Sequence, residues 1–217
     1  QRVVELEFAM RGGPDEMAAR WRANAATMLD HLASGQDAAF LMEGDPMLYS
    51  TFVHVVAALL DARPDLPVVV VPGVSSAQAA AAATLTPLAD RDERLAILPA
   101  LYEGEGLRRV IETFDTVVLL KVSGDLDRIV DALDDLRLAE RAVFVERCGR
   151  TEQRIVRDVR SLRGQRVDYF SLIIVRRQPW ARATSTSSAP DPGRPTSSPC
   201  AVEPSSSEPT SSCTPTP

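Results

Sequence analysis

Short apolar runs alternate with amphipathic segments along most of the chain, which is the order expected of an α/β protein. Residues 1–8 alternate loosely, whereas the later apolar runs are continuous and predict strands that are buried on both faces of a sheet. The expected strands are residues 1–8, 38–42, 68–71, 94–98, 116–122, 142–145 and 169–175. The expected helices are residues 15–32, a segment that starts at Pro46, and residues 77–83, 105–114 and 126–136.

The first strand-to-helix turn that stands out lies in residues 38–60. An apolar run ends at Gly44, Asp45 and Pro46. Asp is a good N-cap and Pro is tolerated at the first helical position, so the sequence predicts that the helix begins here. In open α/β sheets, ligands bind beyond the carboxyl ends of the strands. This turn is therefore a candidate site, although Asp-Pro serves many helices only as a cap.

A second turn of the same kind follows residues 68–71. That run ends at Pro72 and Gly73, and Ser75 and Ser76 then precede an alanine-rich helix. The free N–H groups of the helix and two hydroxyls would face a ligand above the sheet. The alternative is that one of these serines is only an N-cap.

Composition narrows the class of partner. The chain has 217 residues, 45% of them hydrophobic, and a formal net charge of −6. This charge argues against a general nucleic-acid or membrane-surface binder, although local arginines could hold an anionic ligand. Lys121 is the only lysine and ends a predicted strand, where it could face a bound anion or extend into solvent.

The ends of the chain differ in character from its middle. The last residues are rich in Ser, Thr and Pro, so we expect residues 179–217 to be a disordered tail. The length of the chain allows one large domain or two small ones. The chain begins with Gln1 and has no signal-peptide pattern or long apolar run, so we expect a cytoplasmic protein whose true N-terminus is missing.

Common cofactor and catalytic motifs are absent from the sequence. It holds no GxGxxG, GxxxxGK[ST] or HExxH motif, and Cys148, Cys200 and Cys213 have no metal-ligand spacing. His31 and His54 fall within predicted helices, without a neighbouring nucleophile. Such a site suits a reaction with an activated leaving group, in which the protein mainly positions the reactants.

Several segments together resemble the tetrapyrrole (corrin/porphyrin) methylase family. They are, in order, EGDPMLYSTF, VVVVPGVSSAQAAAAA with TPL, ERLAILPA, FDTVVLLKVSGDLDRIVDAL, AVFVERCG with EQRIV, and YFSLIIV. The resemblance covers roughly residues 1–177, and ERLAILPA, KVSGDLD and VFVER are most similar to the precorrin-2 C(20)-methyltransferase branch of cobalamin biosynthesis. It implies the class III methyltransferase fold with two α/β domains, the remainder of an N-terminal one over residues 1–72 and a C-terminal one over residues 73–178. S-adenosylmethionine is expected between them. The family's glycine-rich first loop has no counterpart, which implies a truncated first domain.

The resemblance also assigns residues. It implies cofactor contacts at Glu43, Gly44, Asp45, Leu48, Tyr49, Ser75, Ser76, Lys121, Val122, Cys148, Phe170 and Ser171, with Cys148, Phe170 and Ser171 on the adenine side. Arg11, Arg20 and Arg22 are candidates for binding the carboxylates of a tetrapyrrole substrate. The implied reaction methylates a meso carbon of precorrin-2 in a homodimeric enzyme, with no catalytic residue and no metal identified. The alternatives are another methylase of this fold, and a truncated, inactive remnant.

Overall fold

The computed structural model describes residues 3–8, 12–100 and 105–179. All of them belong to one compact unit, Gln1–Trp180. Arg11 and the predicted tail from residue 180 onward lie outside the described residues. The domain boundary expected between residues 72 and 73 remains a prediction.

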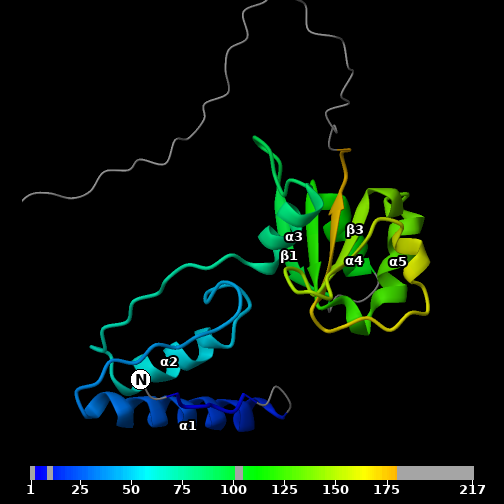
Figure 1. The fold of residues 1–217 in the computed structure, drawn as a ribbon. Coiled ribbons are helices and arrows are strands. Elements are labelled where there is room, and N and C mark those ends of the chain that lie inside the picture. The colour runs from blue at the N-terminus through cyan, green and yellow to red at the C-terminus, as the bar shows by residue number, and fades with distance from the viewer. Residues whose placement is uncertain (1–2, 9–11, 101–104, 180–217) are drawn as a thin grey trace, which may run out of the picture. The chain divides into compact units, whose positions relative to one another are not determined.

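A five-stranded mixed sheet forms the centre of the C-terminal part (Figure 1). Its strands are β1 (Leu95–Pro99), β2 (Thr116–Leu120), β3 (Ala142–Glu146), β4 (Arg154–Val156) and β5 (Ser171–Arg176). They lie in the order β1-β2-β5-β3-β4. The β1–β2 pair is parallel, whereas β5 pairs antiparallel with both β2 and β3, and β4 pairs antiparallel with β3. The last strand of the chain therefore lies between two earlier ones.

Five α-helices are described. They are α1 (Pro14–Ala33), α2 (Phe52–Ala62), α3 (Ser76–Thr84), α4 (Glu105–Thr113) and α5 (Leu126–Asp135). Three 3₁₀ turns, Val122–Gly124, Ala139–Arg141 and Val159–Leu162, complete the regular elements. All five lie where the sequence predicts a helix, and only α2 starts far from its expected residue.

The sheet has a separate apolar core on each face, because successive strand residues point to opposite sides. In β2, Val117 and Leu119 pack into the core beneath α4 and α5. Val118 and Leu120 instead pack with Ala77 of α3 on the other face. Helices thus cover both faces (Figure 1), as the uniformly apolar strands predict.

Three of the predicted strands do not form, and the first of them, residues 1–8, has no strand over its described residues 3–8. Residues 38–42 and 68–71 are extended, but neither run is part of a sheet, and both expose large apolar side chains. Val69, for example, is 88% exposed. An apolar run becomes a buried strand only where neighbouring strands pair with its backbone and other elements cover its faces. Neither condition is met among the described residues.

The start of α2 also differs from the prediction. The sequence suggests a helix from Pro46, but α2 begins only at Phe52. Tyr49 interrupts the helix with a left-handed backbone (φ 52°), and its hydroxyl donates a hydrogen bond to the carbonyl oxygen of Ile97 in β1 (2.8 Å). This contact holds the segment before α2 as a loop against the sheet.

Candidate functional site

A cavity of about 670 Å³ lies at one end of the sheet. Five separated segments line it: the loop of residues 42–51, the start of α3, the end of β2, the end of β3 with the residues after it, and the residues that lead into β5. Sites for small organic ligands usually have volumes of about 300–1,000 Å³. The cavity is therefore large enough for a ligand of nucleoside size.

The cavity opens where β2 and β3 turn away from β5. The N–H of Lys121, just after β2, donates to the carbonyl oxygen of Ser171 (2.8 Å), and the N–H of Arg147, just after β3, donates to that of Phe170 (2.8 Å). Both donors have left-handed backbones, with φ of 59° at Lys121 and 50° at Arg147. The pairing with β5 therefore continues one residue past each strand before the chain turns, and a cationic side chain stands at each turn.

Asp45 joins the two turns that the sequence identifies. One carboxylate oxygen accepts from the N–H of Met47 (2.8 Å) and the other from the N–H of Gly73 (3.0 Å). A Cβ atom at Gly73 would lie 2.2 Å from the carbonyl oxygen of Gly44, so only glycine fits at this approach. One oxygen of Asp45 thus fixes its own turn, and the other ties that turn to the second loop at the cavity.

Ser75 is the N-cap of α3. Its hydroxyl accepts from the N–H of Gln78, and the side chain of Gln78 accepts from the N–H of Ser75, which forms a capping box. The capping role left open by the sequence is therefore real. The N–H groups of Ser76 and Ala77 have no partner among the described residues, and both residues line the cavity. These two groups are available to an oxygen atom of a ligand.

Two aromatic rings and two cations border the cavity. Tyr169 and Phe170 pack edge to face, with ring centroids 5.5 Å apart. The ammonium of Lys121 lies over the Tyr169 ring, 5.2 Å from its centroid, and the guanidinium of Arg150 lies over the Phe170 ring at 5.0 Å. Arg150 also forms an ion pair with Glu43 (2.6 Å). We refer to Lys121, Tyr169, Phe170 and Arg150 as the cation–aromatic rim.

Asp168 and Arg147 hold the approach to β5 in place. The N–H of Phe170 and the guanidinium of Arg147 both donate to Asp168, and these contacts keep the pKa of its carboxyl below the usual value. The hydrogen bond from Asp168 in turn raises the pKa of Arg147. Arg147 therefore stays charged and tied to its neighbour.

Cys148 places a thiol in the cavity wall. Partial burial raises the pKa of this thiol above its usual value. Because the thiolate is the nucleophilic form, the thiol stays neutral and poorly reactive near pH 7. The Cys148 thiol would therefore not attack an electrophilic ligand bound in the cavity.

The structure brings together most of the site residues expected from the sequence. Eleven of the twelve expected cofactor contacts line this cavity: Glu43, Gly44, Asp45, Leu48, Tyr49, Ser75, Ser76, Lys121, Cys148, Phe170 and Ser171. Val122 does not line it, because its side chain is fully buried in the core beneath α4 and α5. What each of the eleven binds remains a prediction.

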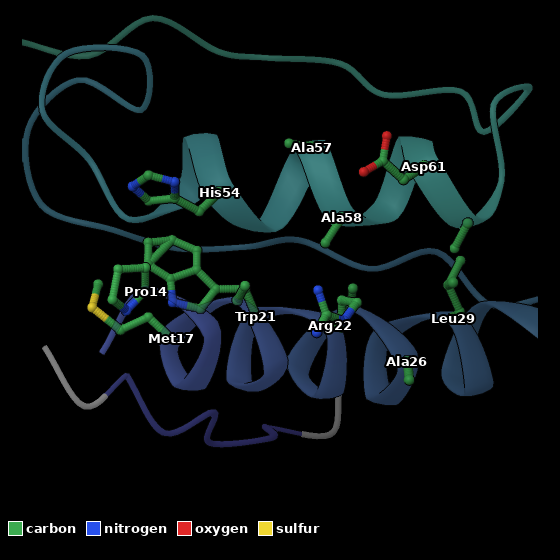
Figure 2. Close-up of a pocket in the computed structure, with 13 residues that line it drawn as sticks. Pro14, Met17, Trp21, Arg22, Ala26, Leu29, His54, Ala57, Ala58 and Asp61 are labelled. Carbon is green, nitrogen blue, oxygen red and sulfur yellow. The ribbon is translucent and has the colours of Figure 1, made fainter. Parts of the chain in front are cut away.

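The candidate substrate arginines lie elsewhere. Arg20 pairs with Glu16 within α1, and Arg22 lines a hollow of about 640 Å³ between α1 and α2 (Figure 2). In that hollow the Trp21 ring lies edge-on against His54, whose pKa is lowered by burial. Trp21 is buried, as expected of a core residue. Neither Arg20 nor Arg22 lines the larger cavity.

Sequence reasoning did not identify Arg147, Arg150 or Tyr169, which also line the cavity. Their positions next to strands could have indicated a place in the site, because Arg147 directly follows β3 and Tyr169 lies shortly before β5. No cluster of three or more potential metal-ligating side chains occurs in the described part of the chain. Its helices are also too short or too polar to cross a membrane.

Comparisons with known proteins agree with this geometry. The chain is 36% identical over 146 residues to the cobalamin biosynthesis protein CobIJ of Mycobacterium tuberculosis, an alignment that covers 67% of the chain and 28% of CobIJ. It is 31% identical over 156 residues to a precorrin-2 C(20)-methyltransferase of a Sinorhizobium species, covering 71% of the chain and 62% of that enzyme. The chain thus spans less than two thirds of either relative.

A solved structure gives the same fold. The uroporphyrin-III C-methyltransferase of Thermus thermophilus, in complex with S-adenosylhomocysteine, superposes with a TM-score of 0.52 at 29% identity. The match covers 70% of this chain and 71% of that one. The family model for tetrapyrrole (corrin/porphyrin) methylases, enzymes that use S-adenosylmethionine as methyl donor, matches residues 1–162. With three quarters of its length matched, this chain belongs to the tetrapyrrole methylase family.

Proposed function

We propose that this chain binds S-adenosylmethionine in the 670 Å³ cavity and transfers its methyl group to a carbon atom of a tetrapyrrole. The observation that carries the proposal is the convergence of eleven expected cofactor contacts, from five separated segments, on one cavity. The product-bound structure of the Thermus relative supports the choice of donor.

The residues present suit this donor. When bound, S-adenosylmethionine supplies an electrophilic methyl group on a cationic sulfur, which a nucleophilic carbon attacks in line. The free N–H groups of Ser76 and Ala77 can bind an oxygen atom of the donor. Gly44, held close to Gly73 through Asp45, lets the backbone approach the ligand.

Catalysis on this account is mainly positioning. Both oxygens of Asp45 accept backbone hydrogen bonds, so we assign this carboxylate a structural role. Cys148 stays a neutral thiol. The chain therefore contributes alignment and exclusion of water, which are enough when the leaving group is already activated. We assign no general base.

Within the family, we propose precorrin-2 as the acceptor and its C20 meso carbon as the site of methylation. The ERLAILPA, KVSGDLD and VFVER segments and the similarity to the Sinorhizobium enzyme support this choice. Methylation of another tetrapyrrole by the same fold is the second candidate. A truncated chain that folds without activity is the third, because the alignments cover only part of each relative.

Calorimetry with S-adenosylhomocysteine tests the cofactor site. We expect saturable binding by the wild type and its loss in Asp45→Ala, since this change removes the hydrogen bond that shapes the Asp45 turn and the one that ties this turn to Gly73. Asp65→Ala is the matched control, because Asp65 is an exposed carboxylate that does not line the cavity. A folded wild-type chain that binds no S-adenosylhomocysteine would refute the proposal and support the inactive remnant.

Methyl transfer tests the acceptor. Isotope-labelled S-adenosylmethionine is incubated with either precorrin-2 or uroporphyrinogen III, and the mass and NMR spectrum of the product locate the new methyl group. Methylation of precorrin-2 at C20 is the expected result. Methylation of uroporphyrinogen III alone would favour the second candidate. The cytoplasmic location and the homodimer are proposals too, and sedimentation at several concentrations tests the dimer.

A further inference from the structure

We propose that Asp168 is a positioning residue for the cofactor, and that it acts from outside the cavity by fixing Phe170 against the adenine of S-adenosylmethionine. Arg147 in turn fixes Asp168. This inference rests on the proposed function and names the two side chains that shape the adenine side of that site. Asp168 does not line the cavity, whereas Arg147 and Phe170 do. It is also not among the cofactor contacts that the family resemblance implies.

The two oxygens of the Asp168 carboxylate have different partners. Oδ1 accepts from the N–H of Phe170, two residues further along the chain (2.8 Å), which closes a tight turn of the kind that Asp favours. Oδ2 accepts from Nε and Nη2 of Arg147, at 3.0 and 2.7 Å. One oxygen therefore shapes the backbone before β5, and the other ties this turn to the residue that follows β3.

Both backbone polar groups of Phe170 are held by this pair. Its N–H donates to the carboxylate of Asp168, and its carbonyl oxygen accepts from the N–H of Arg147 (2.8 Å). On the next residue, the hydroxyl of Ser171 donates to the carbonyl oxygen of Asp168 (2.6 Å). The N–H of Asp168 donates to the carboxylate of Glu146 at the end of β3. The backbone of Phe170 is thus anchored on both sides.

Burial alone does not fix the Phe170 ring, because the residue is 53% exposed. Within the cation–aromatic rim the ring contacts Tyr169 edge to face and lies under the guanidinium of Arg150, whose side chain is itself 45% exposed. A ring this exposed keeps a fixed place only if the backbone that carries it is fixed. Ordering the ring before the ligand arrives removes an entropy cost from binding. The hydrogen bonds of Asp168 and Arg147 supply that order.

Arg147 is suited to holding the wall rather than the ligand. Its guanidinium donates twice to the carboxylate of Asp168, whose side chain is 23% exposed. Arg150, which also lines the cavity, pairs with Glu43, whose side chain is 74% exposed. Water screens the more exposed pair more strongly, so that pair fixes the geometry less firmly. Asp168 therefore gives Arg147 a defined place, and the turn they share passes it on to Phe170.

Calorimetry with S-adenosylhomocysteine measures what each contact contributes. Asp168→Ala removes both, and we expect the dissociation constant to rise about tenfold, the effect of one hydrogen bond to a charged group. Asp168→Asn keeps an oxygen that can close the turn but loses the charge, so we expect a rise of about two- to fivefold. Asp158→Ala is the matched control, because Asp158 also accepts from the N–H two residues on, that of Arg160, away from the cavity. It should bind as wild type does.

Arg147→Gln breaks the same ion pair from the other side. We expect it to weaken S-adenosylhomocysteine binding by about two- to fivefold, as Asp168→Asn does. The variant that carries both changes should bind no more weakly than either single variant, because both changes remove one shared contact. A loss in Arg147→Gln well beyond that in Asp168→Asn would mean that Arg147 contacts the ligand itself, and its positioning role would be wrong.

Phe170→Leu decides whether Asp168 acts through the ring, since it keeps an apolar side chain but removes the aromatic face. If Asp168 acts through Phe170, adding Asp168→Ala to Phe170→Leu weakens S-adenosylhomocysteine binding no further. A merely structural role would make the two losses additive, which contradicts the inference. Adenosine should lose affinity for Asp168→Ala by the same factor as S-adenosylhomocysteine, because the effect lies on the adenine side. Unchanged adenosine affinity would also contradict it.

The outcomes separate this inference from the proposed function. If wild type and Asp168→Ala bind S-adenosylhomocysteine equally well, the positioning role is refuted and the cofactor site stands. If wild type binds none, the proposed function itself fails, and the inference fails with it. Circular dichroism and urea titration show whether each variant is folded. If Asp168→Ala does not fold, Asp168→Asn and Arg147→Gln decide, because both can keep the turn at Phe170, and wild-type affinity in both refutes the inference.

Discussion

Replacing Gly73 with alanine perturbs the meeting of the two loops with a single methyl group. The added Cβ atom would lie 2.2 Å from the carbonyl oxygen of Gly44 and 3.0 Å from its carbonyl carbon. Ordinary contacts of this kind are at least 3.4 Å, and both obstructing atoms belong to the backbone. The loops must therefore separate by about 1 Å, which breaks the hydrogen bond from the N–H of Gly73 to Asp45.

The size of the effect follows from that bond. A hydrogen bond to a carboxylate is worth about 1.5–3 kcal/mol, and this one is exposed, so we expect about 1–2 kcal/mol. If the closed arrangement is the one that binds the donor, the dissociation constant for S-adenosylhomocysteine rises about 5- to 30-fold. Calorimetry measures this change directly.

Gly124→Ala is the matched control. A Cβ atom at Gly124 meets nothing within 4 Å, and this glycine has no left-handed backbone. We expect it to bind S-adenosylhomocysteine as wild type does. The far-UV circular dichroism of Gly73→Ala should match wild type, because Gly73 lies outside the sheet. Equal affinity of Gly73→Ala and wild type would refute the claim that the contact between the loops shapes the cofactor site.

Three further changes test the core, the charges and the backbone. Phe144→Ala should lower the free energy of unfolding by about 3–5 kcal/mol in urea titrations, because Phe144 is fully buried in the sheet core. The pKa of Asp168 is lower in the folded chain, so its stabilising effect is present above about pH 4 and is lost as the pH falls further. The urea midpoint of Asp168→Asn should therefore fall less than that of wild type between about pH 6 and pH 3. The free energy of unfolding of Lys121→Gly should be about 1 kcal/mol larger than that of Lys121→Ala, because only glycine adopts the left-handed backbone of this position without strain.

The central sheet was predictable from the sequence because each strand specifies itself locally. Residues 116–122, 142–145 and 169–175 are apolar on both faces, and such runs fit only a sheet covered by helices on both sides. The same reasoning was wrong for residues 38–42 and 68–71, which are equally apolar but remain outside the sheet. The composition of an apolar run shows that it can be buried. Whether it pairs with other strands depends on segments far away in the sequence.

The site was predictable to the extent that it consists of turns. The loop at Asp45 and the cap at Ser75 are local features with recognisable residues, and both line the cavity. Arg147 and Arg150 carry no such local signal, because a single arginine after a strand is common at any surface. Their place depends on β5, which follows the other described strands in sequence but lies between β2 and β3. Only the folded topology brings Phe170 beneath Arg150.

Backbone strain gives independent reason to regard the cavity as functional. Six non-glycine residues in the described chain have left-handed backbones, and three of them, Tyr49, Lys121 and Arg147, line this one cavity. Each such residue costs of order 1 kcal/mol, and glycine would relieve it. Lys121 and Arg147 turn immediately after their last hydrogen bond to the residues that begin β5. The side chain of Arg147 is accounted for by its ion pair with Asp168. Lys121 forms no ion pair among the described residues, so its retained side chain is best explained by a ligand.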